Sequence, residues 1–136
     1  MKLLIDRNGD VNSRTAGGMT ALHYAALPST AMTRLLLSSG AEIDAINSDG
    51  ETALSQLIDR GISRHWARIK LLISSNASLN HRNPNGKTIL DLSLSEGHLP
   101  LFRLLLDKGV DTSYLQLRQL KGKPAFVKVL QEYNIL

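Results

Sequence analysis

Apolar residues recur along this chain in three pairs of segments, each with helical spacing. The first segment of a pair holds small and medium apolar residues, as at Leu22, Ala25 and Ala26, and the second is richer in leucine and isoleucine. Residues three or four apart lie on one face of an α-helix, so the pattern predicts amphipathic helices that pack in pairs. The predicted helices cover residues 20–27 and 31–38, 52–59 and 66–74, and 88–95 and 99–107.

Turn signals separate the pairs at a nearly constant interval. A Gly-X-Thr triplet precedes each first helix, at Gly18–Thr20, Gly50–Thr52 and Gly86–Thr88. Asp49-Gly50 and Asn85-Gly86 are turn dipeptides, because glycine tolerates positive φ and an Asp or Asn side chain can bond its own backbone. Each second helix is followed by Gly40, Asn76 or Gly109, residues that tolerate the left-handed conformation of a helix C-cap. The chain is therefore predicted to repeat one unit of hairpin, helix, helix and cap.

The start of the first helix carries the most specific motif, Thr20-Ala21-Leu22-His23-Tyr24-Ala25-Ala26. Together with the repeat interval it resembles the ankyrin family, whose repeat of about 33 residues has a Thr-Pro-Leu-His signature and two antiparallel helices. Thr52-Ala53-Leu54-Ser55 and Thr88-Ile89-Leu90-Asp91 are looser copies, and no copy keeps the proline. The resemblance implies an all-α solenoid of antiparallel helix pairs with β-hairpin finger loops.

The resemblance also implies one domain over residues 1–136, with about three full repeats and a partial or capping unit at each end. The expected units are a partial repeat at 1–12, repeats at 13–45, 46–81 and 82–113, and a C-terminal capping unit at 114–136 with short helices near 115–120 and 124–133. The partial repeat cannot bury its apolar face unaided. We therefore expect the chain to be part of a longer chain, or this face to meet a second copy.

The second full repeat carries about three extra residues. Thr52 is 24 residues from its cap, Asn76, whereas Thr88 is 21 residues from Gly109. The extra residues fall near 59–66, a stretch that contains the only tryptophan, Trp66. Insertions in solenoids map to loops on one face, so this loop is a candidate binding element with Trp66 as an anchor. The alternative is a structural role, in which Trp66 shields the inserted loop from solvent.

Charge is concentrated in the same part of the sequence. The chain has a formal net charge of +4, but the stretch from Arg60 to Lys87 contains six basic residues and no acidic one. Two readings stay open: the stretch attracts an acidic partner, or it forms ordinary solvated helix faces. The isoelectric point near 9.6 invites a nucleic-acid reading as well, but no basic face interleaved with aromatic residues is visible, so nucleic acid is an unlikely partner.

Residues that could perform chemistry are scattered. There is no cysteine, which excludes disulfides and thiolate metal sites, and the histidines show no ligand spacing. By the resemblance, His23 and His98 fall where the family has structural histidines. Asp91 takes the place of the signature histidine in its repeat, and we expect its side chain to bond to the backbone of the nearby hairpin tip. We predict no catalytic, cofactor-binding or metal-binding residue and no enzyme activity.

Ankyrin domains bind other proteins through a concave face, hairpin tips and the exposed ends of first helices, and the resemblance implies the same here. Adding the inserted loop, the predicted partner-binding residues are Arg14, Met19, Ile46, Ser48, Asp49, Glu51, Asp59, Arg60, Arg64, His65, Trp66, Arg82, Asn85, Lys87 and Glu96. The expected partner is a protein or peptide, with an acidic one suggested by the basic stretch. The alternative is a regulatory or scaffolding segment of a larger multidomain enzyme.

The longest apolar run is far shorter than the ~18 residues of a membrane span, and the apolar start of the chain is too short for a signal peptide. We therefore expect an intracellular protein, cytoplasmic or nuclear, with no membrane partner.

Overall fold

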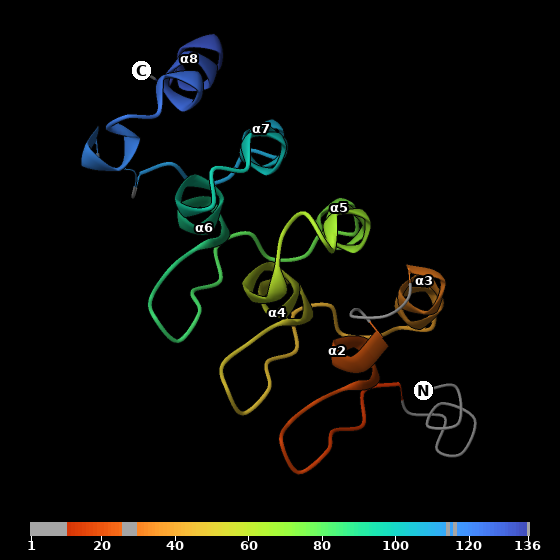
Figure 1. The fold of residues 1–136 in the computed structure, drawn as a ribbon. Helices are drawn as coiled ribbons and strands as arrows, with labels where there is room; N and C mark the ends of the chain where they lie inside the picture. The colour runs from red at the N-terminus through yellow and green to blue at the C-terminus, as the bar shows by residue number, and fades with distance from the viewer. Residues whose placement is uncertain (1–10, 26–29, 114, 116, 136) are drawn as a thin grey trace. The chain divides into compact units, whose positions relative to one another are not determined.

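The computed structural model describes residues 11–25, 30–113, 115 and 117–135. Within these ranges the regular structure is helical and contains no strand (Figure 1). The helices are α2 (Ala21–Ala25), α3 (Thr30–Ser38), α4 (Ala53–Arg60), α5 (Trp66–Ser74), α6 (Ile89–Ser95), α7 (Leu99–Asp107), the 3-10 helix η1 (Leu117–Leu120) and α8 (Pro124–Glu132). Each predicted helix is found where the chain is described. The end of predicted helix 20–27, and residues 1–10 of the partial repeat, lie outside the described residues.

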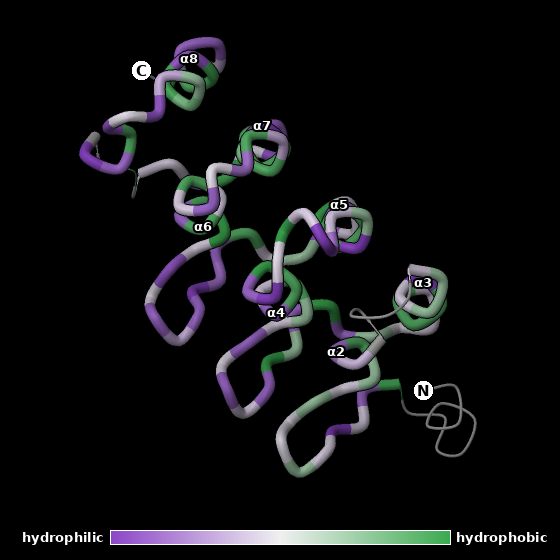
Figure 2. The backbone as a smooth tube through the Cα atoms, viewed as in Figure 1, coloured by the Kyte–Doolittle hydropathy of each residue, from purple (hydrophilic) through white to green (hydrophobic). Residues whose placement is uncertain are grey.

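The chain forms two compact units, residues 1–78 and 79–136. In the first unit α2 packs on α3 and α4 on α5, and each helix of the first pair also contacts its counterpart in the second pair. The apolar side of each helix supplies the core, and Figure 2 shows the alternation of apolar and polar stretches along the chain. The fully buried large side chains of the first unit are Leu22, Leu36, Leu54, Leu57, Ile69, Leu72 and Ile73.

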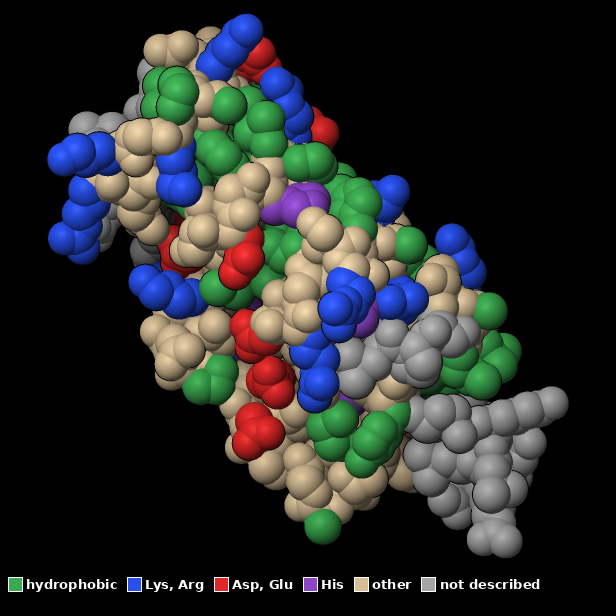
Figure 3. Space-filling model, in the orientation of Figure 1, with side chains coloured by type: hydrophobic (Ala, Val, Ile, Leu, Met, Phe, Trp, Pro, Cys, Tyr) green, Lys and Arg blue, Asp and Glu red, His purple; other side chains and the backbone are tan. Residues whose placement is uncertain are grey.

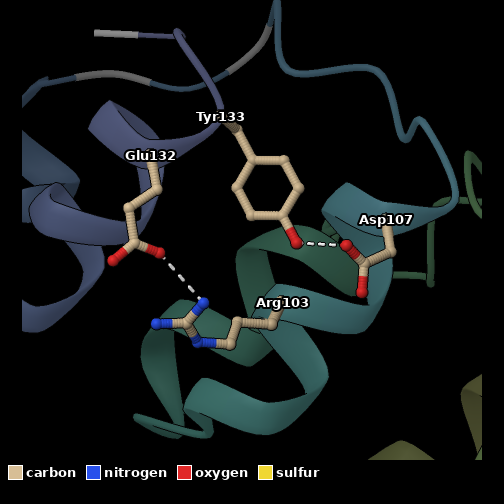
Figure 4. Close-up of polar contacts among 4 residues, drawn as sticks. All are labelled: Arg103, Asp107, Glu132 and Tyr133. Atoms are coloured by element: carbon tan, nitrogen blue, oxygen red, sulfur yellow. Dashed lines mark hydrogen bonds and ion pairs between the residues drawn. The ribbon is translucent and has the colours of Figure 1, made fainter.

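In the second unit α6 packs on α7, and α7 contacts α8, which also contacts η1. The rings of Phe102 and Phe126 meet edge to face with centroids 4.9 Å apart, an arrangement that aromatic pairs favour. Polar contacts add to this apolar contact at the surface (Figure 4): Arg103 pairs with Glu132 at 3.0 Å, and the Tyr133 hydroxyl donates to the carboxylate of Asp107. Helix α8 therefore packs against α7 through both apolar and polar contacts.

The helix starts are fixed by side chains in place of the missing prolines. Thr52 and Thr88 each accept a bond from the backbone three residues later, and Ser55 and Asp91 bond back to the amide of the threonine. These capping boxes satisfy donors that a helix end leaves without partners. Asp91 thus makes the local backbone bond expected of it, accepting from the amide of Thr88 at 3.1 Å.

The second helices end as the sequence indicates. Gly40, Asn76 and Gly109 all have positive φ, at 93°, 71° and 74°. In each case the amide of the following residue bonds back to a carbonyl five residues earlier, as Ala77 does to Leu72 at 3.1 Å. This geometry is the Schellman cap, and it turns the chain sharply out of the helix toward the next hairpin.

Candidate functional site

Three hairpin loops precede the first helices and project away from the helix pairs (Figure 1). We call them finger 1 (residues 14–19) and finger 2 (residues 46–51) in the first unit, and finger 3 (residues 82–87) in the second. Two backbone bonds close each finger. The amides of Thr15, Asn47 and Asn83 donate to the carbonyls of Met19, Glu51 and Lys87, and the carbonyls of the same three residues accept from Gly18, Gly50 and Gly86. They are hairpins without assigned strands.

All the predicted partner-binding residues are at least partly accessible. The exposed residues are Arg14, Ile46, Ser48, Asp49, Asp59, Arg60, Arg64, Arg82, Asn85, Lys87 and Glu96, and the half-buried ones are Met19, Glu51, His65 and Trp66. The first unit holds the residues of fingers 1 and 2, the end of α4 and the start of α5. The second unit holds Glu96 and the residues of finger 3, Arg82, Asn85 and Lys87.

The tips of fingers 2 and 3 are organised by buried asparagines that were not among the predicted residues. The side-chain oxygen of Asn47 accepts from the amides of Asp49 and Glu51, at 2.9 and 3.0 Å, and Asn83 makes the same two bonds in finger 3. The signal was present in the sequence as Asn-X-X-Gly, which recurs at 47–50 and 83–86. These bonds hold the tip backbone while leaving the side chains at the tip exposed.

Fingers 1 and 2 are also joined to each other. Arg14 donates through Nη1 to the carbonyl of Ile46 at 2.6 Å, and the amide of Ser48 donates to the carbonyl of Gly17 at 2.9 Å. A Cβ on Gly18 would lie 3.0 Å from the amide nitrogen of Ser48, which shows how closely the two fingers approach. An open hollow of about 530 Å³ lies beside this junction, lined by Arg14 and residues 42–46.

Three acidic side chains of the first unit lie near one another. Asp49, Glu51 and Asp59 lie together at finger 2 and the end of α4. Burial raises the pKa of Glu51, and the neighbouring carboxylates Asp59 and Asp49 raise it further because a second negative charge is disfavoured there. These carboxylates suit a basic group of a ligand, whereas the expectation of an acidic partner rests on the basic stretch from Arg60 to Lys87.

Basic residues gather at the connection from α4 to α5, residues 61–65, which we call the insert. Arg60 ends α4, Arg64 is exposed within the insert, and Arg68 on α5 donates through Nη2 to Nδ1 of His65 at 2.7 Å. Burial lowers the pKa of His65, and the charges of Arg68, Arg64 and Arg60 lower it further. Figure 3 shows basic side chains gathered beside a histidine on the viewed face.

Trp66 begins α5 directly after the insert and is half-buried. The ammonium group of Lys70 lies 5.5 Å from the centroid of its ring, within the range of a cation–π contact. The ring is thus partly covered by its own helix and partly open to a partner.

His23 in the first full repeat and His98 in the third make structural hydrogen bonds. Nδ1 of His23 accepts from the amide of Thr20 at 3.1 Å, and Nε2 lies 2.9 Å from the carbonyl of Glu51, which it contacts as donor. Burial of this ring lowers the pKa of His23. Nδ1 of His98 accepts from the amide of Leu101 and caps α7. In the described ranges no group of three His, Asp or Glu side chains could hold a metal ion.

A family model for ankyrin repeats, spanning three copies, matches residues 29–115. The chain belongs to the ankyrin-repeat family. The predicted family and fold class are thereby confirmed, since the helix pairs, fingers and caps follow the ankyrin pattern. Ankyrin repeats are generally protein–protein interaction modules and the family is generally non-enzymatic. No curated protein matches the sequence at a significant level. Among the described helices, none has the length and apolar character needed to cross a bilayer.

Proposed function

We propose that this ankyrin-repeat chain is a non-enzymatic interaction module that binds a partner protein through its fingers, the ends of its first helices and the insert. The observation that carries the proposal is the construction of the fingers. Their backbones are fixed by Asn47, Asn83 and the bond from Arg82 to the carbonyl of Gly86, at 2.8 Å. A loop whose backbone is already fixed needs no further ordering of that backbone on binding, which favours affinity.

The acidic group at finger 2 and the basic group at the insert favour a partner with the matching pattern of charge. A partner that presents an acidic segment to the insert and a basic group to Asp49, Glu51 and Asp59 would be matched in sign at both places. Complementary charge speeds association and rejects partners of the wrong pattern. The exposed Ile46, with 46 % of its surface accessible beside the hollow, offers the partner an apolar contact.

The test is affinity capture with quantitative mass spectrometry, using three versions of the whole chain as bait. The tip variant carries Ser48→Arg and Asn85→Arg, which place bulk and charge on fingers 2 and 3. The control carries Ser74→Arg and Gln131→Arg, equally exposed positions on α5 and α8. Both variants change one serine and one amide side chain, so they match in charge and size.

We expect a captured partner to fall at least about tenfold with the tip variant and to stay at the parent level with the control. Circular dichroism of the three baits should coincide, because exposed positions carry little folding energy. If every captured protein is recovered equally by the parent and the tip variant, the fingers are not the binding surface and the proposal is wrong.

A further inference from the structure

We propose that the insert recognises a phosphorylated serine or threonine in a segment of the partner protein. The inference rests on the proposed function and names the chemistry of one part of its surface. The site consists of the guanidinium groups of Arg60, Arg64 and Arg68 around His65 in the first unit. Arg68 contacts His65 directly at 2.7 Å, Arg64 precedes it in the insert and Arg60 ends α4 just before the insert, so the three positive charges lie in one short region of the surface.

The described part of the first unit places no carboxylate in an ion pair with these arginines. In the described ranges the one ion pair joins Arg103 to Glu132, in the second unit, and no carboxylate pairs with Arg60, Arg64 or Arg68. Holding like charges together without counter-charge disfavours the folded state, and a bound anion would remove that cost. The arrangement therefore favours an anionic ligand.

Arg68 supplies the more specific observation. Its Nη2 is committed to His65 at 2.7 Å, and its Nε is buried without a hydrogen-bond partner in the described part of the chain. A buried donor without an acceptor costs free energy, whereas an oxygen of a ligand at this place would satisfy it. His65 thus orients the guanidinium group and leaves its remaining donors for an acceptor.

The number of donors favours phosphate over carboxylate. A carboxylate occupies one guanidinium fork with its two oxygens, but three arginines offer more donors than that. A phosphate monoester carries close to two negative charges at neutral pH and three acceptor oxygens, and it pairs well with arginine clusters. The start of α5 lies directly beside the cluster, and no side chain caps it.

The experiment follows the arginine side-chain signals by nitrogen-15 NMR while the whole chain is titrated with the amide of N-acetyl-phosphoserine. The corresponding glutamate and unphosphorylated serine compounds are the comparison ligands. We expect saturable shifts of the Nε–H signals of Arg64 and Arg68, with a Kd at least about tenfold lower for phosphoserine than for glutamate. Emission from Trp66, the only tryptophan, gives a second readout in the same titration.

Two variants test where phosphoserine binds. Arg64→Gln with Arg68→Gln should abolish the saturable phosphoserine response, whereas Lys121→Gln with Lys128→Gln, which removes the same charge from exposed positions elsewhere, should leave it unchanged. Replacing Arg64 and Arg68 by lysine keeps the charge but removes the forks, and it should weaken phosphoserine by several-fold. Because Arg64 is exposed, Arg64→Gln alone reports on binding even if changes at Arg68 reduce folding.

Linear, non-saturating shifts up to roughly 20 mM phosphoserine, a range that covers millimolar binding, would overturn the inference. So would equal affinity for glutamate. Vesicles containing 20 % anionic phospholipid and a single-stranded RNA are titrated in parallel, and tighter binding of either through Arg64 and Arg68 would assign the cluster to that ligand instead. A failure here, with finger-dependent capture of a partner retained, would leave the proposed function standing.

Discussion

The connection from α4 to α5 and the connection from α6 to α7 solve the same structural problem differently. Both place a histidine at the N-cap of the second helix, His65 before α5 and His98 before α7. His98 accepts from the amide of Leu101 and so satisfies one of the free donors of its helix. His65 does not cap its helix, because its Nδ1 accepts from Arg68 instead.

This difference indicates that the α4–α5 connection is locally less stable than the α6–α7 connection. Residues 96–98 make a short turn with a satisfied cap, and Pro100 at the first turn fixes φ where no donor is needed. The insert is longer, leaves the start of α5 without a side-chain cap and gathers positive charge. Departures from local stability are typical of functional positions, so the comparison favours the insert, over the α6–α7 turn, as a binding element.

The comparison requires that each of the two helix pairs be packed in the same way within its own unit, and the largest predicted effect tests this. Leu72 in α5 and Leu105 in α7 are both fully buried and occupy equivalent positions, since each accepts the bond of its Schellman cap. Leu72→Ala and Leu105→Ala should each lower the free energy of unfolding by about 2–5 kcal/mol through lost contacts and cavities. Urea unfolding followed by circular dichroism measures both.

Costs that differ by more than about 2 kcal/mol between these two substitutions would show that the pairs are not packed alike. The exposed Leu35 provides the control, since 45 % of its surface is already accessible. Leu35→Ala should change stability by no more than about 0.5 kcal/mol.

The elements were predictable because they depend on local chemistry that repeats along the chain. Helical periodicity gave the helices, and Gly40, Asn76 and Gly109 gave their ends. The arrangement of charge was not predictable from position alone. Asp59 and Arg60 are neighbours in sequence, yet one joins the acidic group at finger 2 and the other joins the basic group at the insert.

Which of several possible hydrogen-bond partners a side chain uses also could not be predicted from the sequence. His65 could have capped α5 as His98 caps α7, and only the rotamers of His65 and Arg68 decide that it does not. The bond from Arg14 to the carbonyl of Ile46 in finger 2 depends in the same way on two repeats lying side by side. A residue type in a pattern limits the possible bonds, and packing then selects one of them.

A smaller effect separates the two histidines directly. His98→Ala should lower the free energy of unfolding by about 1 kcal/mol, the usual cost of losing a helix cap. His65→Ala removes no cap, so it should cost less than about 0.5 kcal/mol. Urea unfolding of both variants at pH 7.5, above the ordinary pKa of histidine near 6.5, measures the difference. Equal losses would mean that His65 supports α5 after all, and the contrast between the two connections would fail.

The smallest predicted effect is the pH dependence that His65 contributes. Burial, followed by Arg68, Arg64 and Arg60, lowers the pKa of His65 in the folded chain below its ordinary value of 6.5. As the pH falls below about 6.5, the unfolded chain therefore takes up a proton at this ring more readily than the folded chain does, and stability is lost. The loss is small because the ring is half-exposed and solvent screens the arginines.

The difference between the parent and His65→Ala isolates this contribution, because His23, whose pKa is also lowered, is present in both. We expect the urea midpoint of the parent to fall more than that of the variant between about pH 7.5 and pH 5.5 at low salt. Raising the salt concentration should shrink the difference, since it screens the arginine charges. Parallel pH profiles at low salt would show that His65 does not sense those charges, and the insert would then lack the close basic grouping that distinguishes it from the α6–α7 turn.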